Sequence, residues 1–352
     1  DINTVYTAGS AGTITGLGDE AVTISDTTVD AALLITLDSA TSGIIDASSI
    51  TTLTGSDADK ATVRASNGIT GLPDGGGGGG GGGGDYIVTD TSISASELIS
   101  LDSQYETVNA SAVTTITGTA ADINTVYTAG SAGTITGLGN EAVTISDKTI
   151  AAASLNSLDS NTTGLVNAYS VTSLTGTNAE ILAAYTADTA GTVIIDTDAK
   201  LSVSDNITFT QANVLDAKTT GVITATISTT AIGDLDDLTG TGNAYTITVN
   251  TAQVTASALK AVNAATTVAV DGTAITQITG SAADLADVYD GGVSNLGDET
   301  IILTDTTLAA ATLTPTVNNY SSVAINANSV TTLTGTNAEI LAAYTADTAG
   351  TV

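Results

Sequence analysis

Cysteine, methionine, tryptophan and histidine are all missing from this sequence of 352 residues. Without cysteine there can be neither a disulfide framework nor a thiolate metal site, and without histidine the usual proton carrier near neutral pH is missing. The composition therefore excludes disulfide-stapled scaffolds, cysteine-based zinc sites and histidine-dependent catalysis. It is compatible with an extracellular protein that uses no disulfides.

Basic residues are also scarce, because only 6 Lys and Arg stand against 37 Asp and Glu, for a net charge of -31. Proteins bind nucleic acids mainly through Lys and Arg that displace counterions from phosphates, so we expect no nucleic-acid partner. No apolar run of about 18 residues is present, so we expect no membrane insertion in this segment. The chain opens within a repeat, and we expect it to be a fragment of a longer repeat protein.

Aliphatic residues are abundant. Hydrophobic residues make up 42% of the chain and the mean hydropathy is +0.29. They are mostly Ala, Val, Ile and Leu, and Thr and Ser supply much of the rest. Such a chain can bury a core, and the β-branched residues favour closely stacked strands over an aromatic interior.

The sequence repeats itself nearly word for word. The stretch "DINTVYTAGSAGTITGLGDEAVTISD" at 1–26 returns at 122–147 with one change, and "LTGTNAEILAAYTADTAGTV" occurs at 174–193 and again at 333–352. Self-similarity of this kind is typical of arrays in which each unit packs on its neighbours. We therefore expect one continuous array over residues 1–352.

Threonine-glycine pairs mark the repeat, and their glycines are 40 to 64 residues apart, at Gly55, Gly118, Gly176, Gly240, Gly280 and Gly335. Each unit contains two similar halves, which predicts about 29 residues per rung. Short helices and Val-, Ile- and Thr-rich strands alternate, with glycine at the corners. The fold class predicted is a parallel β-solenoid with short α-helices at its corners.

Each first half begins with a capping signature, Ser or Thr followed three residues later by an acid. It occurs at Ser56, Thr119, Thr177, Ser281 and Thr336. A helix should follow each one. In the second half Asp26, Asp90 and Asp147 precede an apolar trace (Val29, Ala32 or Leu33, and Leu37 in the first case), which predicts a second helix capped by those acids.

Two irregularities interrupt the pattern. Between Gly240 and Gly280 the acid of the capping box is replaced by Ala244, so we expect this helix to be skipped and a strand to follow directly. The ten glycines from Gly75 to Gly84 are either a flexible loop or positions whose residues were not identified.

Three columns of acids and amides recur at equivalent positions. The first contains Asp46, Asn109, Asn167, Asp271 and Asn326. The second contains Asp38, Asp102, Asp159, Asp216 and Asn263, and the third Asp26, Asp90, Asp147 and Asp305. Two interpretations stay open, either caps and hydrogen-bonded ladders at the corners or calcium sites.

The closest sequence to a calcium turn is "GLGDE" or "NLGDE", which makes Asp19, Glu20, Asp298 and Glu299 the candidate metal ligands. For catalysis we predict no site, because Lys60, Arg64, Lys148, Lys200, Lys218 and Lys260 are scattered among different rungs. A recurring tyrosine, at Tyr6, Tyr127, Tyr185, Tyr289 and Tyr344, is expected to be a packing anchor.

The phrases "VTISDTT", "GIIDASSITTLTG" and "TGTNAEILAAYTAD" resemble the repeats of giant, acidic, Thr- and Ala-rich proteins of marine picocyanobacteria. The resemblance covers nearly the whole chain apart from the glycine run. The resemblance implies a secreted or cell-surface protein without catalytic activity. One giant member of that family is associated with swimming without flagella. It carries no functional residues with it.

The expected function is therefore that of an extracellular structural repeat protein that forms a filament, a surface layer or a motility-related coat. Its partners would be copies of itself, joined end to end. One alternative is a calcium-stabilised adhesin stalk. Another is a solenoid enzyme that acts on polysaccharides, which would require several basic residues on one face.

Overall fold

The computed structural model describes residues 2–72 and 85–352, so the ten glycines lie outside the described residues. The protein is a mixed α/β structure with many short parallel strands in several small sheets, and none of the described sheets closes into a barrel. Among the described residues, no helix is both long and apolar enough to cross a bilayer.

The chain divides into two compact units that alternate along the sequence. Unit 1 comprises Asp1–Asp147, Ser154–Ser170 and Ala187–Ile194, and unit 2 comprises Lys148–Ala153, Val171–Thr186 and Ile195–Val352. Each unit is described by itself below.

Parallel sheets of two to five short strands build unit 1. Their orders are β1(Val22–Thr23)-β3(Ile45–Asp46)-β5(Ile69–Thr70), β2(Thr28–Asp30)-β4(Thr52–Thr54), β10(Ile135–Thr136)-β8(Thr107–Asn109)-β6(Asp85–Ile87), and β15(Val193–Ile195)-β13(Val166–Ala168)-β11(Ala142–Ile145)-β9(Thr115–Gly118)-β7(Ser92–Ser94). The helices α1(Ile2–Ser10), α2(Ala31–Ala40), α3(Asp57–Ala65), α4(Ala95–Gln104) and α5(Ala120–Ala132) separate these strands, and α6(Ala152–Asn161) and α7(Asn178–Ala190) have residues in both units.

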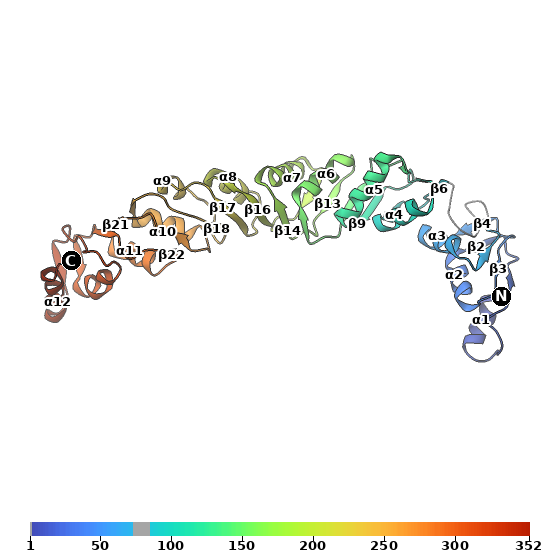
Figure 1. Ribbon diagram of the computed structural model, residues 1–352, viewed down its shortest axis with the longest axis horizontal. Coiled ribbons are helices and arrows are strands. Elements are labelled where there is room, and N and C mark those ends of the chain that lie inside the picture. Colours follow the sequence, from blue (N-terminus) through green and yellow to red (C-terminus); the bar gives the residue numbers. More distant parts are fainter. Residues whose placement is uncertain (1, 73–84) are drawn as a thin grey trace. The chain divides into compact units, whose positions relative to one another are not determined.

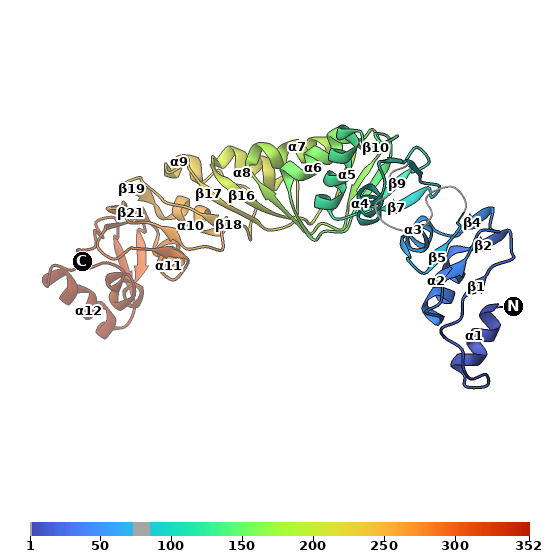
Figure 2. The same ribbon diagram turned by 45° about the vertical axis from the view of Figure 1, so that its right-hand side comes forward.

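Unit 2 is organised in the same way. Its sheets are β12(Thr149–Ala151)-β14(Ser173–Gly176)-β16(Lys200–Ile207)-β17(Ile223–Ile227)-β18(Ala244–Thr246), β19(Gln253–Thr255)-β21(Gln277–Gly280)-β23(Thr300–Leu303), β20(Val270–Asp271)-β22(Val293–Ser294) and β24(Thr307–Ala309)-β25(Thr332–Thr334). Its helices are α8(Phe209–Asp216), α9(Ile232–Leu235), α10(Ala256–Ala264), α11(Ala282–Tyr289), the π-helix Thr312–Thr316, the 3-10 helix Val317–Asn319 and α12(Asn337–Thr348). Helices α8 and α9 lie along one side of strands β16, β17 and β18 (Figure 1), and the turned view agrees (Figure 2).

The register shows that the predicted repeat length was too long. We call the stretch between two paired residues a rung; a rung spans 20 to 27 residues, as in Ile116 opposite Val143 and Val143 opposite Val166. The prediction of 29 residues halved the spacing between threonine-glycine pairs. That spacing covers two rungs, from Ile116 to Val166, plus eight residues that lead to Leu174 on another sheet, so the halved value is too large.

The five predicted capping signatures are confirmed as helix starts. The hydroxyl of Thr119 accepts from the Asp122 amide at 3.1 Å, and that of Thr336 accepts from the Glu339 amide at 3.3 Å. The skipped helix is also confirmed, because β18 begins at Ala244. A side-chain acceptor at the N-cap satisfies an amide that the helix itself leaves free.

In the second-half helices the apolar face differs from the predicted one. Ala31, Leu34 and Leu37 are buried, whereas Leu33 is 51% exposed. The helix begins at Ala31, after strand β2, and its cap is Asp30, not Asp26. The face was misplaced because the helix starts four residues later than Asp26 would place it.

In two rungs the first residue of a second-half helix lies against the glycine of the next threonine-glycine pair. A Cβ added to Gly118 would lie 3.2 Å from the Cβ of Ala95, and one added to Gly280 would lie 2.5 Å from the Cβ of Ala256. Both alanines are fully buried at the first position of a helix in the preceding rung. The glycine is therefore needed because adjacent rungs approach too closely there for a side chain.

Candidate functional site

A buried glutamate connects consecutive rungs. Glu141 is fully buried, and its Oε2 accepts a hydrogen bond of 3.0 Å from the hydroxyl of Tyr127, fourteen residues earlier. Its Oε1 accepts from the Gly139 amide at 2.7 Å. Burying a carboxylate is costly unless its oxygens are hydrogen-bonded, and both oxygens of Glu141 are.

The backbone of the same glutamate is tied to the next rung. The hydroxyl of Thr162 donates to the carbonyl oxygen of Glu141 at 2.7 Å and accepts from the Gly164 amide at 2.9 Å. Tyr127, Glu141 and Thr162 therefore form one hydrogen-bonded chain that leads from the interior of α5 to the segment before β13.

The arrangement recurs at two further glutamates. The Glu20 carboxylate accepts from Tyr6 at 3.1 Å and the Glu20 carbonyl from Thr41 at 2.9 Å. Glu299 likewise accepts from Tyr289, and its carbonyl accepts from Ser321 at 2.6 Å. The sequence predicted these tyrosines to be packing anchors and gave no role to the hydroxyl residues Thr41 and Thr162, four positions before β3 and β13. The signal was present as the recurring pairs of hydroxyl residues at 41–42, 162–163 and 321–322.

The acid–base properties follow from these hydrogen bonds. The Gly18 amide, together with the backbone of Glu20 and the Tyr6 hydroxyl, holds the pKa of Glu20 below its ordinary value. Burial, and then the charge of Glu141, raises the pKa of Tyr127. The raised pKa keeps Tyr127 a neutral donor, and the lowered pKa keeps Glu20 an ionised acceptor.

These contacts bear on the four candidate calcium ligands. Glu20 and Glu299 have their carboxylate oxygens directed to tyrosine hydroxyls and backbone amides, while their neighbours Asp19 and Asp298 lie exposed. Nowhere in residues 2–72 and 85–352 do three potential metal-ligating side chains gather in one group. The calcium site stays a prediction, and the geometry brings none of the four into a set of ligands.

The third acid column caps helices, but not those predicted. Asp147 Oδ2 accepts from the Ala120 amide at 2.7 Å, and Asp305 Oδ2 accepts from the Ala282 amide at 2.8 Å. Both amides belong to the first residue of the helix in the preceding rung. The prediction assigned each Asp to the helix that follows it, because capping was considered only within the local sequence.

The second column lies inside the helices, in contrast to its predicted place after them. Asp38, Asp102 and Asp159 are in the last turns of α2, α4 and α6. A carboxylate there opposes the helix dipole. Contacts to the next rung compensate: Asp38 accepts from the Ser66 hydroxyl at 2.8 Å, and Asp216, at the end of α8, accepts from the Asn243 side chain at 2.9 Å.

The first column forms local turns. Each side-chain oxygen accepts from the amide two residues on, for example the Ser48 amide to Asp46 at 3.0 Å and the Tyr169 amide to Asn167 at 3.0 Å. These residues do not stack on one another, because Asp46 lies opposite Thr23 and Thr70. The column repeats only once in two rungs, so the predicted ladder is interrupted by threonine.

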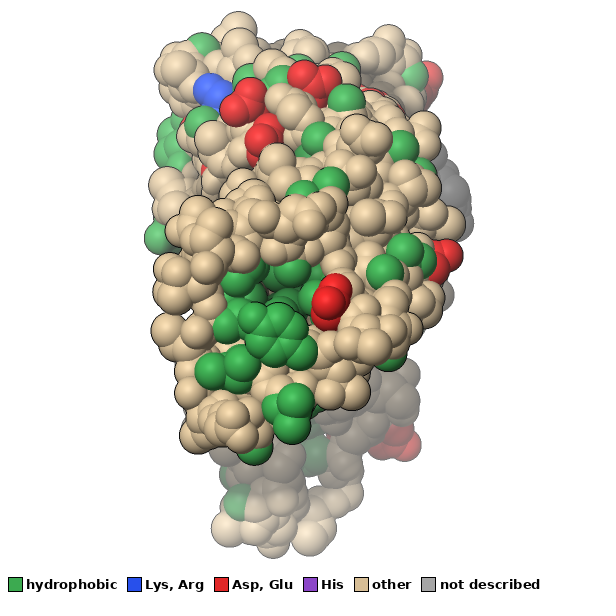
Figure 3. All heavy atoms as spheres, turned by 90° about the vertical axis from the view of Figure 1, so that its left-hand side faces the viewer, with side chains coloured by type: hydrophobic (Ala, Val, Ile, Leu, Met, Phe, Trp, Pro, Cys, Tyr) green, Lys and Arg blue, Asp and Glu red, His purple; other side chains and the backbone are tan. Residues whose placement is uncertain are grey.

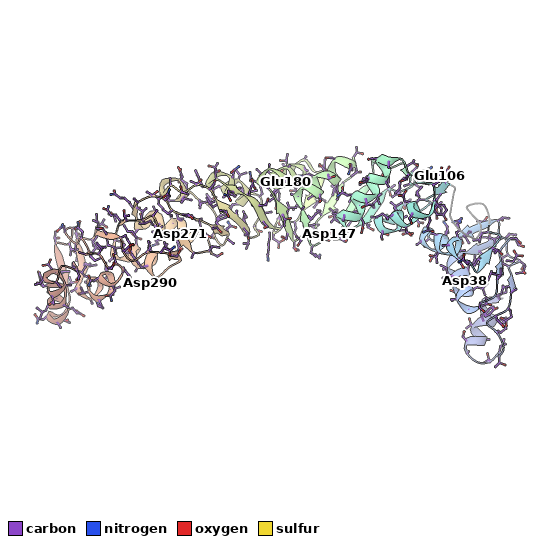
Figure 4. The ribbon with its side chains drawn as sticks, viewed as in Figure 1. Asp38, Glu106, Asp147, Glu180, Asp271 and Asp290 are labelled. Atoms are coloured by element: carbon purple, nitrogen blue, oxygen red, sulfur yellow. The ribbon has the colours of Figure 1, made fainter. Side chains whose placement is uncertain are left out.

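The basic residues do not gather into a reactive group among the described residues. Lys260 lies 3.3 Å from Asp284 and 2.5 Å from Asp287 on the next rung, where it links α10 to α11. The acids labelled in Figure 4 do not gather at one place within either unit: Asp38, Glu106 and Asp147 are spread along unit 1, and Glu180, Asp271 and Asp290 along unit 2.

The hydrogen bonds of the glutamates and of the third acid column therefore link one rung to the next. The other acids described above serve in helix caps and local turns. No family model, no curated protein and no solved structure matches this chain.

Proposed function

We propose that the chain is a structural module of an extracellular protein, a β-solenoid with short helices at its corners that builds a filament, a surface layer or a motility-related coat. The module is non-catalytic, and residues 1–352 form one continuous array within it. The parallel register and the short rungs support this proposal.

The observation that carries the proposal is the capping of one rung by the next. Helix α5 receives the carboxylate of Asp147, and α11 receives that of Asp305. The cap of each of these helices comes from the next rung, as does one partner of the glutamate network. A single rung by itself would therefore leave some of its hydrogen-bonding groups without partners. Interactions between nearest neighbours dominate the stability of such arrays, and their length can grow without a change of design.

The net charge of -31 supports a fibre whose sides do not bind the sides of other copies. Like charges on the sides of two coils repel each other and disfavour lateral contact. We infer that copies join end to end, and heterologous contacts of this kind give an open fibre.

The alternative of a calcium-stabilised adhesin stalk is favoured by the acidic excess alone. A thermal melt with and without a calcium chelator separates the two functions. A loss of tens of degrees on chelation supports the adhesin stalk, and an unchanged midpoint supports the plain fibre. A polysaccharide-acting enzyme would need free basic residues on one face, and Lys260 is already held by two aspartates.

Electron microscopy of the native material tests the proposal. We expect continuous fibres or a regular layer. Discrete, separate particles at the same concentration would contradict it.

A further inference from the structure

The sequence contains a single asparagine-glycine pair, Asn67 and Gly68. The pair lies in the turn between α3 and β5, where Asn67 is exposed and Gly68 is half-buried. Glycine has no Cβ, so its main-chain nitrogen can approach the side-chain carbonyl carbon of the asparagine without steric hindrance. The pair therefore places a main-chain nitrogen next to a side-chain amide with which it can react.

The Gly68 nitrogen is the first member of a hydrogen-bonded relay. Its N–H donates to the Ser66 hydroxyl oxygen at 3.0 Å, and the Ser66 hydroxyl donates to Asp38 Oδ2 at 2.8 Å. Both distances lie within the reach that proton transfer requires. A nucleophile becomes more reactive when it is hydrogen-bonded to a proton acceptor that a third group orients.

The carboxylate of the relay comes from the preceding rung. Asp38 lies in the last turn of α2 and is labelled in Figure 4. A Cβ on residue 68 would collide with Asp38 Oδ1, so the carboxylate has room beside the turn because that residue is glycine. Ser66 is the C-cap of α3, and its amide donates to the Val63 carbonyl oxygen at 3.3 Å. Both ends of the relay are therefore attached to helices.

The corresponding turns after α5 and α7 lack the reactive groups. Residues 65–70 read ASNGIT, whereas residues 131–136 read SAGTIT and residues 189–194 read TAGTVI. At those turns alanine stands in place of Ser66 and glycine in place of Asn67. The combination of amide, hydroxyl and carboxylate is therefore specific to the turn after α3 among these three.

We propose that Asn67 and Gly68 form a self-modification site, at which the folded protein converts its own asparagine to aspartate and isoaspartate. The Gly68 nitrogen bonds to Cγ of Asn67, and the bond from Cγ to Nδ2 breaks. The proton of the Gly68 nitrogen passes to Ser66 as the Ser66 proton passes to Asp38. The relay returns a proton to the leaving nitrogen, so ammonia departs and a cyclic imide remains.

Water completes the reaction, because Asn67 is exposed. Hydrolysis of the imide bond between the nitrogen and Cγ gives aspartate. Hydrolysis of the bond between the nitrogen and the main-chain carbonyl carbon gives isoaspartate, in which the main chain runs through the former side chain. No co-reactant other than water is needed.

The conversion alters the contact with the preceding rung. The Ile45 amide donates to the Gly68 carbonyl oxygen at 2.7 Å, and Ile45 lies opposite Ile69 in the pairing of β3 with β5. Isoaspartate adds a methylene group to the main chain directly before Gly68, which displaces that carbonyl oxygen. The new carboxylate also adds to a net charge of -31, on a molecule whose basic side chains are sparse, as one face illustrates (Figure 3).

The test is the rate of conversion at Asn67 in the whole chain, followed by peptide mass mapping at neutral pH. The same chain unfolded in urea is the control for the effect of sequence alone. We expect the folded chain to convert about 10-fold faster, below the usual range for a base in direct contact, because Asp38 acts through Ser66. Equal or slower conversion in the folded chain would overturn the inference.

Three variants test the relay. Ser66→Ala removes the hydroxyl, and Asp38→Asn keeps an oxygen that can accept from Ser66 but removes the charge. We expect both to convert at about the rate of the unfolded chain, and Ser66→Thr, which restores a hydroxyl, to recover most of the folded rate. Asp38 is a positioning residue in this scheme, and a wild-type rate in Asp38→Asn would refute its part in the reaction.

The effect on the neighbouring rung has its own readout. Hydrogen exchange at the Ile45 amide should become faster as the wild-type chain ages, and should stay constant in Asn67→Gln, whose longer side chain does not form the same imide. Exchange that changes equally in both chains would refute this effect. The inference does not depend on the proposed function, because all of its residues belong to one turn of unit 1 and the rung before it.

Discussion

Replacing Thr162 with valine tests the hydrogen-bonded connection between rungs. The substitution keeps the shape of the side chain and removes a hydroxyl that is 7% exposed, donates to the Glu141 carbonyl at 2.7 Å and accepts from the Gly164 amide at 2.9 Å. The carbonyl of a fully buried residue then has no partner from this side chain. Leaving such a group unsatisfied costs about 1–3 kcal/mol, and the half-buried Gly164 amide adds less because water can reach it. We expect a loss of about 2–3 kcal/mol for Thr162→Val.

The neighbouring threonine provides the matched control. Thr163 is exposed, and its amide and its hydroxyl both donate to the Gly139 carbonyl, at 2.9 and 3.2 Å. Thr163→Val removes only the exposed hydroxyl bond, and the amide bond persists. We expect a change within about 0.5 kcal/mol, as for most surface substitutions. Urea unfolding followed by circular dichroism measures both, and Thr266→Val with Thr267→Val repeats the comparison in unit 2, where Thr266 donates to the Tyr245 carbonyl at 2.7 Å. Equal destabilisation by the Thr162 and Thr163 variants would refute the reasoning.

Three further predictions concern other contacts between and within rungs. Gly280→Ala should destabilise by about 1–3 kcal/mol because the new Cβ would meet the Ala256 Cβ, a cost typical of overpacking that thermal unfolding can measure. Asp147→Ala should cost about 0.5–2 kcal/mol through the lost cap on Ala120 and should expose the start of α5 to faster hydrogen exchange. The Thr273 hydroxyl and the Asn295 side chain hold the pKa of Asp271 below its ordinary value, so its contribution to stability is present above about pH 4 and is lost as the pH falls through the folded-state pKa. Asp271→Asn should remove this part of the acid-induced loss in a pH series of unfolding midpoints.

Matched controls exist for the first two of these. Gly233→Ala places a Cβ in open space within α9 and should be neutral or slightly stabilising. Asp19→Ala removes an exposed carboxylate and should change stability by less than about 0.5 kcal/mol. If the controls cost as much as Gly280→Ala and Asp147→Ala, the contacts between rungs have no special weight.

Local features of the fold could be predicted from the sequence because their causes are local. The Thr119–Asp122 pair predicted the start of α5, and Ala244 in place of the acid predicted the skipped helix. The alternation of Thr and aliphatic residues likewise indicated parallel strands, and the structure has many of them in small sheets.

The features that were wrong depend on the neighbouring rung. Asp147 follows its own strand in sequence, yet it caps a helix that starts 27 residues earlier. The length of a rung could not be read from the threonine-glycine spacing, because the chain advances by one strand between Val166 and Leu174. Register decides both, and one sequence without its pairing partners does not contain the register.

The candidate site was predicted only in part. Glu20 and Glu299 were singled out as calcium ligands for their charge, whereas their hydrogen bonds to Tyr6 and Tyr289 depend on tyrosines 14 and 10 residues away. The threonine that completes the connection, Thr162 in the case of Glu141, is a residue type so common in this chain that its role is invisible without the structure.

The central claim is that the chain forms one continuous stack of parallel strands and assembles along that stack. Cryo-electron microscopy of native fibres measures it directly, through the spacing along the fibre axis. We predict a repeat of about 4.8 Å along the axis, which is the distance between hydrogen-bonded strands. Fibres in which this spacing runs across the axis, or particles without it, would contradict the account.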